Sequence, residues 1–156
     1  MPYTMIIALA IHIVSAVIWV GGMFFAYTCL RPSMGTLEHA PDRLRLWRSV
    51  FARFFRYVTM DIVLLIASGY WMIFMEFGGF AGAGVHIHIM NLTGFLMMGL
   101  FGHLYFAEWL KFRRAVDAQD FPTAGARLNR IRMIVAINLG LGWITIIVGT
   151  TGRYWG

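Results

Sequence analysis

The chain has 156 residues, of which 60% are hydrophobic and 13% are charged, and its mean hydropathy is +0.70. A soluble domain is roughly one quarter charged, so this composition excludes a protein whose main solvent is water. The formal net charge of +6 would suit a nucleic-acid-binding protein, but the placement of the basic residues excludes that partner, as described below.

Four apolar stretches each reach the ~20 residues needed to cross a hydrocarbon core. They are Thr4–Leu30, Phe54–Phe77, His86–Leu110 and Ile131–Thr151. The first lacks the basic start and the cleavage site of a signal peptide, so we expect it to remain as a helix. None shows the alternation of a membrane-spanning strand. We therefore predict an all-α fold, a four-transmembrane-helix antiparallel bundle that forms one domain over residues 1–156.

The basic residues lie almost entirely in two connections. Six follow the first stretch (Arg31, Arg43, Arg45, Arg48, Arg53 and Arg56), and six follow the third (Lys111, Arg113, Arg114, Arg127, Arg130 and Arg132). The connection Gly78–Val85 carries none, and Arg153 is the one that remains. The positive-inside rule therefore predicts cytoplasmic basic connections and both termini on the periplasmic side. The basic charge reports membrane orientation, so no nucleic-acid partner is expected.

Two connections have compositions that predict their structure. Leu37–Val50 sets apolar residues against arginines, and we expect it to form a short amphipathic helix lying on the inner leaflet. Phe77–Gly84 is rich in glycine, which predicts an irregular outer loop.

Polar side chains inside the spans are the best indicators of function, because they are costly in lipid and usually face the bundle interior. At ~1.5 Å of rise per residue, Asp61, His103 and Asn138 share a depth of ~10 Å from the cytoplasmic side, which predicts an inner polar layer. His12 lies on a stripe of mostly small residues of the first span. An outer layer is predicted at its height, formed by His12, Ser68, Asn91 and Thr145.

The histidines and methionines suggest a metal. Neutral imidazole is a common metal ligand, which makes His12 and His103 candidates. Met72 and Met75 approach His86 and His88 across the outer loop, and thioether with imidazole suits Cu(I). These side chains are the predicted copper ligands, with Asp61 as the acid of the inner layer.

Several motifs resemble the membrane domain of the CopD copper-resistance family. They are His12 followed seven residues later by Trp19-Val20-Gly21-Gly22, Arg31-Pro32 at the end of the first span, and Phe54-Phe55-Arg56 at the start of the second. The resemblance covers most of the chain. It implies a multi-pass protein of the bacterial inner membrane that takes up or handles copper, with His12 as a ligand.

A second likeness is to small membrane haem proteins, including HemJ-type protoporphyrinogen oxidases, which share a His in the first span and a Trp soon after it. This sequence departs from them, with Leu30-Arg31-Pro32-Ser33 at the end of the first span. The likeness implies b-haem between His12 and a third-span His, either His88 or His103, with Arg153 near the propionates. His12 can face His88 if the third helix begins near Phe80. If that helix begins at His86, His88 is ~10 Å too shallow.

We favour copper, because ligands at several depths suit the passage of an ion. His86, His88, Met72 and Met75 would capture it, His12 would hold it midway, and Asp61 with His103 would form an inner site. A haem-b redox protein, which would be an oxidoreductase, and a structural or assembly subunit without a cofactor remain alternatives. The lipid bilayer is the expected environment. A periplasmic copper carrier, a quinone or electron-transfer partner, and a second copy of the chain remain open as partners.

Overall fold

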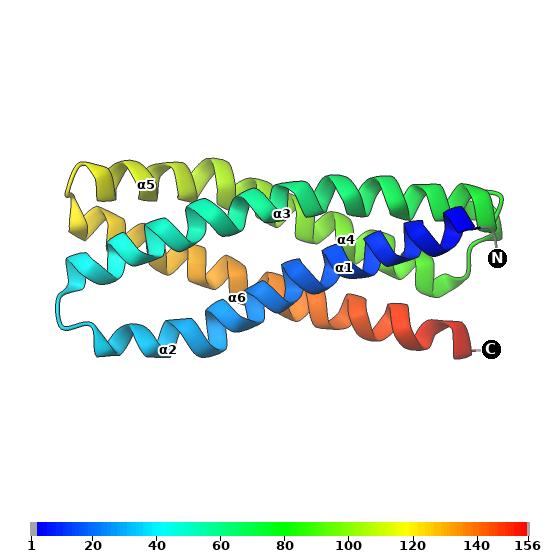
Figure 1. The fold of residues 1–156 in the computed structure, drawn as a ribbon, viewed down its shortest axis with the longest axis horizontal. Helices are drawn as coiled ribbons and strands as arrows, with labels where there is room; N and C mark the ends of the chain where they lie inside the picture. The colour runs from blue at the N-terminus through cyan, green and yellow to red at the C-terminus, as the bar shows by residue number, and fades with distance from the viewer. Residues whose placement is uncertain (1–2, 156) are drawn as a thin grey trace.

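The computed structural model describes residues 3–155, which form four long antiparallel helical rods (Figure 1). The first rod comprises α1 (Tyr3–Phe25), the π-helical turn η1 (Ala26–Leu30), α2 (Arg31–Ser33) and the 3-10 turn η2 (Met34–Thr36). The second is α3 (Ala40–Glu76). The third comprises α4 (Val85–His103), the π-helical η4 (Leu104–Trp109) and α5 (Leu110–Asp117), and the fourth comprises α6 (Phe121–Thr151) and the 3-10 turn η5 (Gly152–Tyr154). Residues 3–155 contain no strand, and all four rods are long and apolar enough to span a membrane, so the predicted all-α four-helix fold is confirmed.

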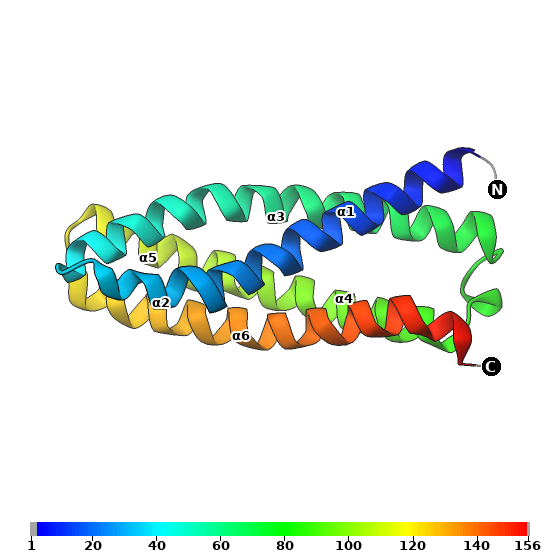
Figure 2. The ribbon, with the colours of Figure 1, turned by 60° about the horizontal axis from the view of Figure 1, so that its bottom comes forward.

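The rods associate as two pairs. The longest contact joins α1 to α3, and the next longest joins α4 to α6. The start of α1, the end of α6 and the loop between α3 and α4 lie at one end of the bundle, and Figure 2 shows the first turns of α1 diverging from α6 there. The glycine-rich end is therefore more open than the basic end.

The densest packing lies at the basic end. Phe51 stacks on Phe55 with ring centroids 5.0 Å apart, and Trp109 meets Phe55 edge-on at 5.4 Å. Trp47 and Phe112 are almost fully buried beside them. Each large aromatic side chain buries roughly 150–250 Å², so this aromatic core holds the four rods together.

The exposed surface changes along the rods. Large apolar side chains such as Ile6, Ile7 and Val63 are exposed in the glycine-rich half, whereas arginines cover the other half. The second rod, α3, has 37 residues and is therefore about 55 Å long, against roughly 30 Å for a hydrocarbon core. The basic end of the bundle thus extends beyond the bilayer as a water-facing, well-packed continuation.

The predicted amphipathic helix over Leu37–Val50 is wrong as a separate surface element. This segment forms the first turns of α3, which runs without a break from Ala40. No Gly or Pro interrupts the sequence from Asp42 to Ser68, and the apolar side of the segment buries Leu44 and Trp47 in the aromatic core. All four rods extend beyond the apolar limits predicted from the sequence.

The connection after α3 is irregular, as its glycines predict. Gly78 and Gly79 have φ angles of 64° and 112°, which L side chains rarely adopt, and a short 3-10 turn (Phe80–Gly82) follows before α4 begins. The opposite connection, after α5, is tight. The Asp120 carboxylate accepts a hydrogen bond from the Thr123 backbone N–H at 3.2 Å and so caps α6.

Candidate functional site

His12 lies on α1 against α3, half-buried in the more open half of the bundle. Its Nδ1 is 3.0 Å from the Ser68 Oγ, and that hydroxyl donates its proton to the Leu64 carbonyl oxygen at 2.5 Å. Since the single Ser68 proton is used in this bond, the Ser68 oxygen accepts from His12 Nδ1–H. The neutral imidazole therefore carries its proton on Nδ1 and has a free lone pair on Nε2.

Small residues allow this close approach. A Cβ at Gly69 would lie only 3.1 Å from His12 Cε1, so the imidazole ring rests directly on the α3 backbone. Beside the imidazole, toward the open end of the bundle, a groove of about 320 Å³ runs between α1 and α3. Its lining is mainly apolar and includes Ala8 and Ile11, and Ser68 is one of its few polar residues. His12 is thus held against α3 beside this groove, whose lining includes its hydrogen-bond partner Ser68.

Two further polar contacts lie at the same end of the bundle. Tyr70 donates to Asn91 Oδ1 at 3.3 Å, which joins α3 to α4. Thr145 Oγ1 is 2.7 Å from Thr93 Oγ1 and 3.8 Å from the buried Met97 sulfur, which joins α6 to α4. The residues predicted for the outer layer therefore form three separate contacts, and His12 with Ser68 is the one that holds an imidazole.

The predicted capture residues lie around the outer loop. Met72 is half-buried on α3, whereas Met75 and His88 are exposed. His86 is half-buried, and its side chain packs so closely on Gly152 that a Cβ there would overlap it. The Phe80 ring lies between Tyr70 of α3 and His88 of α4, with centroids 5.7 Å and 6.1 Å away.

The predicted inner layer is divided by the structure. Asp61 is buried and faces the Ser15 side chain of α1, and its Oδ2 has no hydrogen-bond partner among the described residues. The Asn138 amide donates to the Met97 carbonyl at 3.2 Å. His103 is exposed at the end of α4, and no hydrogen bond among the described residues joins it to Asp61. Within residues 3–155 there is no cluster of three His, Cys, Asp or Glu side chains that could hold one metal ion.

The structure also does not show the geometry required for haem, in which His12 faces His88 at one height. The third helix begins at Val85, and under the reasoning given above this start places His88 too shallow to face His12. Arg153 lies in the exposed η5 turn, with its guanidinium over the Tyr154 ring at 4.6 Å.

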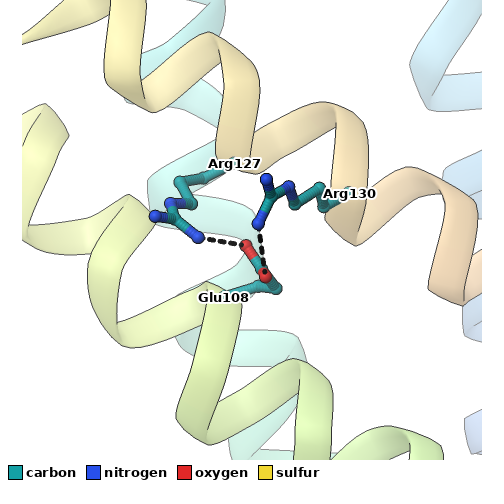
Figure 3. Close-up of polar contacts among 3 residues, drawn as sticks. All are labelled: Glu108, Arg127 and Arg130. Atoms are coloured by element: carbon teal, nitrogen blue, oxygen red, sulfur yellow. Dashed lines mark hydrogen bonds and ion pairs between the residues drawn. The ribbon is translucent and has the colours of Figure 1, made fainter.

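Glu108 is a buried charged residue that the sequence reasoning missed. Its side chain is 6% exposed, and its carboxylate accepts from Arg127 at 3.1 Å and from Arg130 at 3.5 Å (Figure 3). The three residues join η4 to α6. An acid at the inner end of an apolar stretch, facing two arginines across a short turn, was the signal available in the sequence.

The comparisons with known proteins bear on these residues. The family described as Copper resistance protein D matches residues 48–151. The chain belongs to the copper resistance protein D family. No curated protein and no solved structure matches it.

The family match covers most of α3, the third rod and the whole of α6. It supports a copper-resistance membrane protein at the level of the family. Ser68, Asp61 and the outer-loop histidines lie inside the matched region, whereas α1 with His12 precedes it. What His12 does must therefore be argued from its own contacts in this copper resistance protein D chain.

Proposed function

We propose that this chain binds copper in the outer half of its membrane bundle, with His12 as the central ligand, and passes the ion across the membrane as its substrate. The observation that carries the proposal is the hydrogen bond from His12 Nδ1 to Ser68 Oγ at 3.0 Å. Metal-binding histidines almost always donate their other ring N–H to an oxygen in this way, which fixes the tautomer and the ring orientation. The free Nε2 then serves as the ligand atom.

Thioether sulfur supplies the softer ligands. Met72 lies four residues after Ser68 on α3 and is half-buried, so it shares a helix face with the oxygen that orients His12. Imidazole with thioether sulfur favours Cu(I) over harder cations. A site with so few ligands holds the ion weakly enough to release it, which passage through a membrane requires.

The outer loop provides the capture step of this proposal. His88 and Met75 are exposed at the end of the bundle that carries no Lys or Arg except Arg153, and Met72 and His86 lie behind them. With the basic end in the cytoplasm, this end faces the bacterial periplasm and can receive copper from a carrier there. Asp61, buried nearer the basic end, is the next polar group inward from His12.

The test is Cu(I) binding by the purified full chain under reducing conditions, measured by competition with a coloured chelator. His12→Gln should bind much less Cu(I) while unfolding like the parent, because Gln keeps the size and polarity but coordinates poorly. Ser68→Ala should weaken binding by roughly 10–100-fold, the usual cost of removing the group that orients a ligand. His39→Gln, an exposed histidine at the basic end, is the matched control and should bind like the parent.

The same preparation separates the alternatives. Equal Cu(I) affinity in His12→Gln and His39→Gln would remove His12 from the proposal. A Soret band in the purified parent protein would instead support the haem-b redox function, and protein with neither copper nor haem would support the structural subunit.

A further inference from the structure

Two arginines meet near the boundary between the apolar and basic halves without an acid between them. Arg31 is the first residue of α2 and Arg132 lies in α6, and their guanidinium groups are close enough to repel each other. Within residues 3–155 neither forms an ion pair. By contrast, the arginines that do pair are Arg45, Arg48, Arg127 and Arg130. The repulsion between Arg31 and Arg132 is therefore uncompensated by the chain itself.

These two arginines line one cavity together with Trp47. The Arg132 guanidinium lies over the Trp47 ring at 5.8 Å, and that of Arg31 lies over the Tyr27 ring at 5.0 Å. The remaining wall is apolar and includes Phe51. Among residues 3–155, the only side-chain acceptor bonded to Arg132 is the neutral Asn129 amide, at 3.4 Å.

Two of the residues that line this cavity also carry a buried N–H group without an acceptor among the described residues. Trp47 Nε1 and Arg132 Nε are both buried, and neither has a hydrogen-bond partner among the described residues. Trp47 itself is 2% exposed. Buried N–H groups are rarely left unsatisfied in folded proteins, so each such group calls for an acceptor. An acceptor that carries negative charge would also reduce the repulsion between the two arginines.

We propose that Arg31, Trp47 and Arg132 form a binding site for a phosphate group at the inner surface of the membrane. A phosphate oxygen can accept from Trp47 Nε1 and Arg132 Nε, and the planar guanidinium groups match phosphate in shape and charge. The cavity measures about 20 Å³, which admits a single oxygen-sized group. The rest of the phosphate then lies at the mouth, where Arg31 is exposed.

The phosphate can belong to a lipid headgroup or to a free ion, and the position of the site favours the headgroup. Arg31 and Arg132 lie where the apolar stretches Thr4–Leu30 and Ile131–Thr151 end, which is the level of lipid phosphates. Lys and Arg pockets between helices on the cytoplasmic side recognise anionic headgroups by the same chemistry. The cluster would then fix the bundle at a defined depth.

The experiment uses the full chain in detergent and counts bound short-chain phosphatidic acid by native mass spectrometry, with phosphatidylcholine and inorganic phosphate as separate arms. Arg31→Gln with Arg132→Gln should weaken phosphatidic acid binding by at least roughly tenfold, because two charge-assisted contacts are removed. Trp47→Phe keeps the ring but removes the N–H, and it should also weaken binding. Arg53→Gln with Arg56→Gln removes the same charge from exposed, unpaired positions of α3 and should change binding less than twofold.

The phosphatidic acid and inorganic phosphate experiments distinguish a lipid headgroup from a free phosphate ion. Retention of phosphatidic acid without displacement by millimolar phosphate supports a lipid site, and displacement supports a site for the free ion. Either result requires loss of binding in the Arg31 and Arg132 variant. Equal losses in both double variants would show only general attraction to positive charge and would overturn the proposal. Full binding by both Trp47→Phe and the Arg31→Gln, Arg132→Gln variant would also overturn it.

Discussion

The buried carboxylate of Glu108 predicts an unequal response to the loss of either partner in its ion pair. Replacing Arg127 with Met leaves the Glu108 side chain, 6% exposed, with only the longer 3.5 Å contact to Arg130. Removing one partner of a buried pair costs roughly 3–5 kcal/mol. Because Arg130 remains, we expect a loss near the lower limit, about 3 kcal/mol in the free energy of unfolding.

Replacing Glu108 with Gln should cost much less. The arginines that lose their partner are 25% and 61% exposed, so water can solvate both guanidinium groups. A partly exposed ion pair contributes roughly 0–1 kcal/mol, and we expect a loss of about 1 kcal/mol.

Reversible unfolding in mixed micelles, followed by circular dichroism, measures both values. The double variant should be less destabilised than the sum of the two single changes by about 3 kcal/mol, because the Arg127 change harms only a chain that still carries the buried charge. Arg53→Met, at an exposed position outside any ion pair, controls for the loss of an arginine. Equal costs for the two single changes, or strict additivity, would refute this account of Glu108.

Three further predictions concern orientation, packing and pH. In a Cys29→Ala background, Ala81→Cys in the outer loop should react with an impermeant thiol reagent from the periplasmic side, whereas Ala118→Cys should not. Labelling of Ala118→Cys and not of Ala81→Cys would show that the bundle has the opposite orientation. Gly152→Ala would place a Cβ on the His86 side chain and should cost roughly 1–3 kcal/mol in unfolding experiments, whereas Gly140→Ala meets nothing within 4 Å and should be near neutral. The Arg48 guanidinium holds the pKa of the exposed Asp117 carboxyl below its usual range, so this ion pair stabilises the fold above pH ~4 and that contribution is lost as the pH falls through the lowered pKa. Arg48→Gln should therefore flatten the acid side of the stability curve, and an unchanged curve would show that the pair contributes nothing.

The number and order of the helices could be predicted from the sequence because lipid imposes a simple rule. A run of about 20 apolar residues must form a helix to satisfy its backbone, and the glycines at 78 and 79 must interrupt it. The full length of the helices could not be predicted from hydropathy. The segment from Ala40 to Phe54 is too charged to resemble a membrane span, and its helical continuity comes from packing of Trp47 and Phe51.

The candidate site shows where prediction from depth ends. Counting residues along the helices placed His12 and Ser68 at one height, and they are hydrogen bonded. The same counting placed Asp61 with His103, yet Asp61 faces Ser15 and His103 is exposed. Depth fixes the height of a side chain but not its direction around the helix. In lipid both faces of a helix can be apolar, so hydropathy gives little information on the direction of a side chain.

The central claim is that the Nε2 atom of His12 is the atom that binds copper. Nitrogen NMR of the full chain labelled with ¹⁵N-histidine observes this atom directly, and Cu(I) is diamagnetic. Before the metal is added, the account predicts a protonated Nδ1 and an unprotonated Nε2 for His12. On titration with Cu(I), the Nε2 resonance of His12 should shift while Nδ1 keeps its proton. A proton on Nε2 of the free protein, or a His12 signal that does not change at saturating Cu(I), would contradict it.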